Sequence, residues 1–88
     1  MRYPEAVKLM TDTLWWVKSK EDLEGILWDI LTPNETIAVW ERLEIFRKLL
    51  KGTSQREIAE YLGVSITTVT RGNRVLKHEN PTVDKYLK

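Results

Sequence analysis

The order of apolar and polar positions predicts helices along the whole chain and no strand. The clearest signal lies between residues 54 and 71. Ser54 and Glu57 form the S-x-x-E pattern of a capping box, which starts a helix. Ala59 is small enough for a second helix to cross close above it, and Gly63 can adopt the left-handed conformation that ends the first helix. The segment is therefore expected to form a helix that ends in a tight turn.

The residues after this turn complete a helix-turn-helix. Val64 supplies an apolar plug, Ser65 can cap the next helix, and Val69 faces the point where the two helices cross. In DNA-binding proteins with this motif, the second helix lies in the major groove. The pattern therefore favours DNA binding. A helical hairpin that only packs, or that binds another protein, is the alternative.

Start and stop signals predict four further helices, at about residues 5–18, 20–31, 33–51 and 83–87. Pro33 fits the first position of the third of these helices, Ser19 begins an S-x-x-D cap for the second, and Gly52 ends the third. The third helix carries an apolar stripe, which consists of Val39, Leu43, Phe46 and Leu50. The predicted fold class is all-α, with six helices.

The length of 88 residues fits one small domain over residues 1–88. Within it we expect a dimerisation core at about 1–52, the helix-turn-helix at 53–78 and a C-terminal helix at 79–88. Apolar side chains surround the second helix, and they include Ile26, Leu27, Trp28, Ile30 and Leu31. Because a helix that is apolar all round must be buried all round, the pattern predicts a dimer in which the first two helices wrap around a partner chain.

Composition excludes several classes of protein. The chain has no cysteine and only one histidine, His78, so we expect no disulfide and no metal site. No apolar run is long enough for a membrane helix, and no secretory signal follows Met1. These features suit a cytoplasmic protein. An enzyme is not expected, because the chain also lacks a glycine-rich phosphate loop.

The net charge of +1 gives little indication of nucleic-acid binding, but the distribution of charges along the chain is more informative. From Tyr61 to His78 there is no carboxylate, whereas one arc of the second motif helix carries threonines and cations. This outer arc consists of Thr67, Thr70, Arg71, Arg74 and His78, flanked by Thr68. Such side chains can bind phosphates and base edges. An ordinary solvated face is the alternative, although such a face would normally carry acids.

Other residues of the motif have expected positions too. The first turn of the second helix, from Ser65 to Thr68, should lie nearest the bases. Gln55 and Arg56 begin the preceding helix, where amides and a cation would meet a phosphate. The core-facing side of the second helix is predicted to hold Ile66, Val69, Asn73 and Leu76.

Arg42 borders the apolar stripe of the third helix. An arginine at such an edge usually extends to solvent or pairs with a neighbouring carboxylate. It can also bind the carboxylate of a ligand. Both interpretations remain open at this point.

Several motifs together resemble one known family. They are Leu31-Thr-Pro-Asn-Glu35, Arg42-Leu-Glu-Ile45, Leu49-Leu-Lys-Gly52, Ser54-Gln-Arg-Glu-Ile58 and Ile66-Thr-Thr-Val-Thr-Arg-Gly72. In one register over about residues 23–87, they are similar to the Trp repressor family. The run from Thr70 to Lys77 resembles the YerC/YecD subgroup more closely than the tryptophan-responsive repressors.

The resemblance implies an intertwined all-helical dimer that binds DNA and represses transcription. It also implies a corepressor, L-tryptophan or a related amino acid, between the central core and the helix-turn-helix. Thr32 and Arg42 match positions that line this pocket, Arg71 matches an arginine that stacks on the indole, and Gly72 leaves room beside it. The resemblance further assigns to DNA a set of residues made of Arg56, Ile66, Thr67, Thr68 and Thr70.

Two departures from the family pattern weaken tryptophan as the ligand. Val75 replaces a small hydroxyl residue that helps to hold the ligand amine, and Arg74 adds positive charge near the expected pocket mouth. The chain's own tryptophans carry no hint of a ligand, because buried aromatic residues are most often core. They are Trp15, Trp16, Trp28 and Trp40.

The leading hypothesis is a homodimeric repressor gated by a small amino-acid-like corepressor. A ligand-independent DNA-binding module is the first alternative. A helical protein-interaction module without DNA binding is the second.

Overall fold

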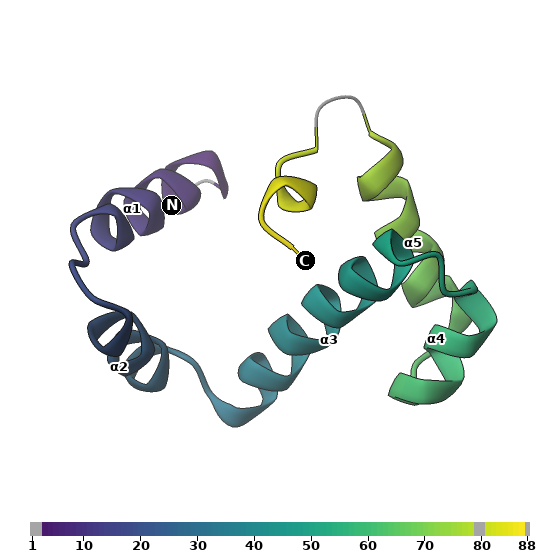
Figure 1. The fold of residues 1–88 in the computed structure, drawn as a ribbon. Helices are drawn as coiled ribbons and strands as arrows, with labels where there is room; N and C mark the ends of the chain where they lie inside the picture. Colours follow the sequence, from purple (N-terminus) through teal and green to yellow (C-terminus); the bar gives the residue numbers. More distant parts are fainter. Residues whose placement is uncertain (1–2, 79–80, 88) are drawn as a thin grey trace. The chain divides into compact units, whose positions relative to one another are not determined.

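A computed structural model describes residues 3–78 and 81–87, and these residues form helices and no strand. The elements are α1 (Tyr3–Trp15), α2 (Lys20–Ile30), α3 (Pro33–Leu50), α4 (Gln55–Leu62), α5 (Ile66–Lys77) and the short 3₁₀ helix η1 (Val83–Lys85) (Figure 1). The all-α prediction is therefore confirmed. No helix in this part of the chain is long and apolar enough to cross a membrane.

The chain divides into two compact units, residues 1–33 and residues 34–88. The first unit holds α1, α2 and Pro33, the first residue of α3, and the second holds the rest of α3 with α4, α5 and η1. This division describes contacts within one chain. The predicted boundary between a dimerisation core and the helix-turn-helix, at residue 52, stays a prediction.

Local signals account for the two helices of the first unit. Ser19 caps α2, because its side chain accepts a hydrogen bond of 3.0 Å from the backbone N–H of Asp22. α1 ends at Trp15, three residues before the predicted end at Lys18. Its last turn loosens there, where the Trp16 N–H reaches the Thr13 carbonyl at 3.4 Å.

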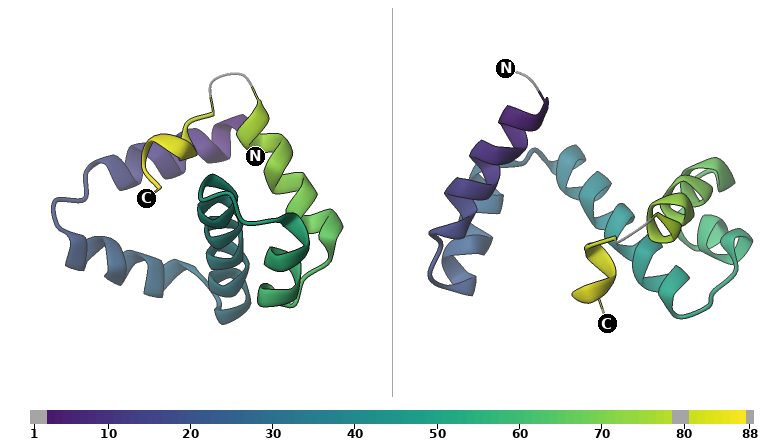
Figure 2. Two further views of the ribbon diagram at one scale, coloured as in Figure 1. Left: turned by 45° about the vertical axis from the view of Figure 1, so that its right-hand side comes forward. Right: turned by 90° about the horizontal axis from the view of Figure 1, so that it is seen from above.

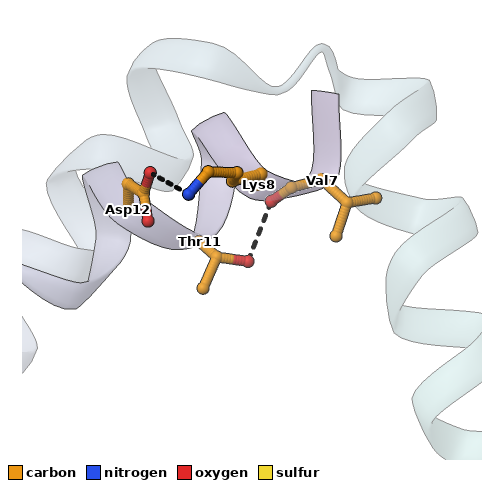
Figure 3. A network of polar contacts seen from close by, with 4 residues as sticks. All are labelled: Val7, Lys8, Thr11 and Asp12. Atoms are coloured by element: carbon orange, nitrogen blue, oxygen red, sulfur yellow. Dashed lines mark hydrogen bonds and ion pairs between the residues drawn. The ribbon is translucent and has the colours of Figure 1, made fainter. Parts of the chain in front are cut away.

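The contacts along α1 are short-range. Figure 3 shows the Thr11 hydroxyl donating to the Val7 carbonyl at 2.8 Å and the Lys8 ammonium 3.8 Å from the Asp12 carboxylate. Both contacts join residues four positions apart and are exposed. The ion pair contributes only about 0.3–0.5 kcal/mol, and a threonine bond back to its own helix adds no stability. Neither contact builds a core.

The first unit buries no described side chain. Trp15, Trp16 and Trp28 are 82%, 76% and 79% exposed, and in the second unit Trp40 is 48% exposed. The prediction that these tryptophans are core residues is thus wrong for a single chain. Two helices of 13 and 11 residues have too little surface to enclose such large side chains between them.

The second unit has a small closed core, which lies where α3, α4 and α5 meet (Figure 2). Each helix contributes one fully buried residue: Ile45, Ile58 and Val69 are 2%, 0% and 0% exposed. The residues packed against them are Leu49, Ala59, Leu62 and Val64. The predicted places of Ala59 and Val64 in the helix-turn-helix are therefore confirmed.

The apolar stripe predicted for α3 is not its buried face in a single chain. Val39, Leu43 and Leu50 are 41%, 41% and 45% exposed, whereas Ile45 is buried. The helix-turn-helix covers only the C-terminal half of α3, and the side of Ile45 is the side that it contacts. Val39, Leu43 and Leu50 therefore stay partly exposed in the single chain, and Phe46 faces the groove beside α5.

Glycines shape both turns around α4. Gly52 has a φ of 87°, and it follows α3 in a Schellman arrangement: the Thr53 N–H donates to the Lys48 carbonyl at 3.0 Å and the Gly52 N–H to the Leu49 carbonyl at 3.0 Å. Gly63 has a φ of 67° and ends α4 in the left-handed conformation. Both stops agree with the sequence prediction.

The last predicted helix is shorter than expected. It is the single 3₁₀ turn Val83–Lys85, and Thr82 before it makes no side-chain capping bond. Tyr86 and Leu87, which were predicted to belong to the helix, lie beyond it. A segment of three residues cannot pass the unfavourable nucleation step of an α-helix. Residues 79, 80 and 88 of the predicted C-terminal helix region lie outside the described residues.

Candidate nucleic-acid interface and ligand groove

Two serine caps hold the helix-turn-helix in shape. The Ser54 hydroxyl oxygen accepts from the Glu57 N–H at 3.2 Å, and that of Ser65 accepts from the Thr68 N–H at 3.2 Å. Each cap satisfies an N–H that the helix itself cannot bond, which contributes about 1 kcal/mol. Both predicted caps are confirmed, and they fix the first turns of α4 and α5.

The predicted DNA-binding residues divide by exposure. The exposed ones are Arg56, Ser65, Ile66, Thr67, Arg71 and Arg74. Gln55, Thr68 and Thr70 are half-buried. Ile66 is 51% exposed, so its predicted place on the core-facing side is wrong. It lies in the first turn of α5, just after the cap, where the crossing helix no longer covers it.

Two hydroxyl groups of α5 already have protein partners. The Thr70 hydroxyl lies 2.7 Å from Oε1 of Gln55 and 2.9 Å from the Ile66 carbonyl, and these two acceptors share its single proton. The Thr68 hydroxyl shares a hydrogen bond of 2.9 Å with the Ser65 hydroxyl. The Thr70–Gln55 bond joins α4 to α5, and it leaves the NH₂ group of Gln55 to point away from Thr70.

The surface of α5 carries no carboxylate, while one cation beside the motif is partly neutralised. Arg47 lies 3.3 Å from the Glu44 carboxylate on its own helix. Lys48 of α3 lies 4.1 Å from the ring centre of Tyr61 on α4, a cation–π contact between these helices. Within the described residues, none of the predicted DNA-binding cations, Arg56, Arg71 and Arg74, forms an ion pair.

A groove of about 290 Å³ runs between α3 and α5. Its lining consists of Arg42, Ile45, Phe46, Thr68, Arg71, Gly72 and Val75. The helices touch at its base: a Cβ atom built on Gly72 would lie 2.7 Å from Cγ2 of Ile45. A side chain at residue 72 would collide with Ile45, so glycine is needed for this close approach of α5 to α3.

The groove brings together three of the four residues predicted to bind a ligand. Arg42 comes from α3, and Arg71 and Gly72 come from α5. Thr32 belongs to the first unit, and its predicted role stays a prediction. Arg74 was expected near the pocket mouth, but it is not among the residues that line the groove.

Sequence reasoning missed the apolar floor, which Ile45 and Phe46 form. The signal was present in the spacing: these residues lie three and four positions after Arg42, which places all three on one helical face. On α5 the same spacing links Thr68 to Arg71, Gly72 and Val75. A search for two facing stripes of this kind would have found the floor.

Comparison with known proteins bears on this arrangement. The family model described as Trp repressor protein matches residues 5–88. The chain belongs to the Trp repressor family. This family consists of DNA-binding regulators and not of enzymes, which confirms the expectation that the chain is not an enzyme. Among its described residues, no group of three or more histidine, cysteine, aspartate or glutamate side chains could hold a metal ion.

Individual members of the Trp repressor family align with most of the chain. The Trp operon repressor homolog of Xylella fastidiosa is 38% identical over 81 residues, which cover 91% of this chain and 88% of that protein. The homologs of Photobacterium profundum and Vibrio campbellii are each 42% identical, over 66% and 74% of this chain. The chain spans 57% and 66% of these two proteins. No solved structure matches the chain significantly. The closer resemblance to the YerC/YecD subgroup stays a prediction.

Proposed function

We propose that this chain is a sequence-specific DNA-binding transcriptional repressor that acts as a homodimer, with a small corepressor bound in the groove between α3 and α5. The observation that carries the proposal is the exposed surface of α5. It presents Thr67, Arg71 and Arg74 and no carboxylate, on a helix capped and packed as the second helix of a helix-turn-helix. Phosphates and guanine edges are the partners that such a surface fits.

The first unit supports the dimer. Its two helices bury none of their described residues, and they expose large apolar side chains that include Trp15, Trp16 and Trp28. An unpaired apolar surface of this kind is typical of a protein–protein interface. Two copies of the helix-turn-helix would read two half-sites about one duplex turn apart.

The groove supports gating by a ligand. Gly72 lets α5 touch Ile45 of α3, so a molecule held beside this contact lies against both helices. Arg42 would bind a carboxylate and Arg71 would stack on a flat body. A ligand there would fix the angle of α5, and this angle decides whether two copies of α5 enter successive major grooves. L-tryptophan or a related amino acid is the corepressor that the family resemblance offers.

Selection of bound duplexes from a random DNA pool tests the proposal, with and without added amino acids. We expect a palindromic site whose half-sites lie about 10 base pairs apart. The absence of any enriched sequence at low salt would remove the DNA-binding function. It would leave a protein-interaction module as the remaining candidate.

A charge-matched pair of variants ties the binding to α5. Arg74→Ala should weaken affinity for the selected site by about 5- to 100-fold and lower the slope of log affinity against log salt by about 1. Lys8→Ala on α1 removes the same charge from the first unit and should leave both quantities unchanged. Equal losses in the two variants would show that only the overall charge matters.

A further inference from the structure

A hydrogen bond between two half-buried polar side chains joins the helices of the helix-turn-helix. Gln55 is the first residue of α4, and its Oε1 atom accepts from the Thr70 hydroxyl of α5 at 2.7 Å. Both ends of this bond lie on backbone that the core holds in place. Ile58, one turn after Gln55, and Val69, the residue before Thr70, are each 0% exposed. The bond therefore links two fixed points of the motif.

The NH₂ group of Gln55 is open to a partner from outside the chain. Within the described residues no bond to this group is present, since the bond to Thr70 uses the amide oxygen. In this part of the chain, every buried polar atom of a side chain has a hydrogen-bond partner. An NH₂ group without a partner must therefore reach solvent. It offers N–H donors there and no acceptor.

The position of Gln55 selects the kind of acceptor that this group would meet. In a helix-turn-helix bound to DNA, the first helix crosses the backbone of the duplex while the second enters the major groove. Gln55 and the exposed Arg56 begin this first helix, so their outward groups would lie nearest to phosphates. A glutamine that reads adenine uses its amide oxygen and nitrogen together. Here the oxygen is bonded to Thr70, which favours a phosphate, because a phosphate oxygen needs only a donor.

From this geometry we propose that Thr70 is a positioning residue for the Gln55 amide: it holds the amide oxygen inward, so that the NH₂ group donates to a phosphate of the operator. The inference rests on the proposed DNA-binding function and adds the partner of Gln55. A free glutamine side chain loses rotamer freedom when it binds, whereas this one is ordered before DNA is bound. The same bond attaches the phosphate contact on α4 to α5, so it also helps to fix how α5 enters the major groove.

A double-mutant cycle on the full chain tests the inference, with a fluorescently labelled duplex that carries the selected site. Thr70→Val keeps the shape and removes the hydroxyl, and it should weaken DNA binding by about 5- to 20-fold. Gln55→Ala should weaken binding by about 10- to 100-fold, because a bond to a charged phosphate is lost. When Gln55 is already alanine, the loss caused by Thr70→Val should be at least about threefold smaller. Thr70→Ser keeps the hydroxyl and should bind within about threefold of the unchanged chain.

Changes in the DNA supply a second measurement, which a loss of protein stability alone would not move. Each phosphate of one half-site is replaced in turn by an uncharged methylphosphonate. For the unchanged chain, we expect one phosphate whose replacement weakens binding by at least about fivefold and whose effect is absent in Gln55→Ala and reduced in Thr70→Val. Phosphates that bind arginines should keep their effect in all three proteins.

Equal losses from Thr70→Val in the two backgrounds would overturn the inference, because Thr70 would then act without Gln55. The same set of sensitive phosphates in all three proteins would overturn it too. If Thr70→Val fails to fold, Thr70→Ala replaces it in the cycle, since alanine is the better helix former. A chain that selects DNA but shows no coupling between the two residues would refute only the positioning role. An unchanged chain that selects no DNA would refute the proposed function and the inference with it.

Discussion

In the second unit, α3, α4 and α5 each contribute one fully buried apolar side chain, whereas the described residues of α1 and α2 in the first unit contribute none. Both units consist of helices joined by short connections. They differ in geometry: three helices that cross at one point can enclose Ile45, Ile58 and Val69. Two helices cannot enclose side chains as large as those of Trp15 and Trp16.

The comparison teaches where the stability of each unit must come from. The second unit has its own small core, so it supports the helix-turn-helix from within. The first unit has apolar surface but no interior, so its stability depends on what covers that surface. Similar substitutions in the two units can show whether a unit is stabilised by its own core or by a partner that covers its surface.

The largest effect is expected in the core of the second unit. Ile58→Ala should lower the free energy of unfolding by about 2–5 kcal/mol, because Ile58 is 0% exposed and its loss leaves a cavity. Urea unfolding at fixed protein concentration measures the change. Ile66→Ala is the matched control: Ile66 is 51% exposed, and its loss should cost less than about 1 kcal/mol. A similar cost at both residues would contradict the assigned core.

A slightly smaller effect is expected for a substitution in the first unit, and the quantity that changes should be the dissociation constant of the dimer. Trp28 is 79% exposed on α2. Trp28→Glu should raise the dimer dissociation constant by at least about 30-fold, because buried tryptophans dominate interface energies. Sedimentation equilibrium measures it.

Tyr86→Glu is the control for this change, since Tyr86 is 80% exposed in the second unit and outside the proposed interface. It should leave the dissociation constant unchanged. If the chain without substitutions is a monomer, the idea that a partner copy covers the first unit is wrong, because the tryptophans of this unit would then be exposed in solution.

The smallest effect on stability is expected when a glycine is replaced by alanine in each of the two units. A Cβ at Gly72 would lie 2.7 Å from the branched, buried Ile45, so Gly72→Ala should destabilise the chain by about 1–2 kcal/mol. A Cβ at Gly25 on α2 meets nothing within 4 Å, so Gly25→Ala should stabilise it by up to about 1 kcal/mol through helix propensity. Thermal unfolding at equal concentrations gives both signs. A destabilising Gly25→Ala would show that a partner copy packs directly on Gly25.

The sequence predicted those elements of the fold that depend on local chemistry. Serine caps, two glycine stops and a proline at a helix start act within a few residues, and the structure has a helix boundary at each of them. The end of α1 was misjudged because no glycine marks it, and the last helix because nothing caps it. Burial was harder: Ile45 and Val39 have similar chemistry, and only the position of α4 and α5 decides which of them is covered.

In the candidate site too, some residues could be predicted from the sequence, whereas others depend on how the helices pack. Arg42, Arg71 and Gly72 could be chosen from family resemblance, and the groove brings them together. The spacing of Ile45 and Phe46 after Arg42 marks one face of α3, but only the close approach of Gly72 to Ile45, 27 positions apart in sequence, shows that α5 lies against this face. The hydrogen bond between Thr70 and Gln55 was also invisible, since both residues had been assigned to DNA independently.

The hydrogen bond between Thr70 and Gln55 limits which hydrogen bonds α5 could form with the bases of an operator. The only hydroxyl proton of Thr70 is used inside the protein, on the oxygens of Gln55 and Ile66. Toward DNA the residue offers lone pairs and a methyl group. While these bonds persist, it can accept from the amino group of adenine or cytosine and contact the methyl of thymine, and its proton is not free for guanine O6 or a phosphate. The base pair opposite Thr70 would then be chosen by what it donates, and the task of recognising acceptors would fall to Arg71 and Arg74.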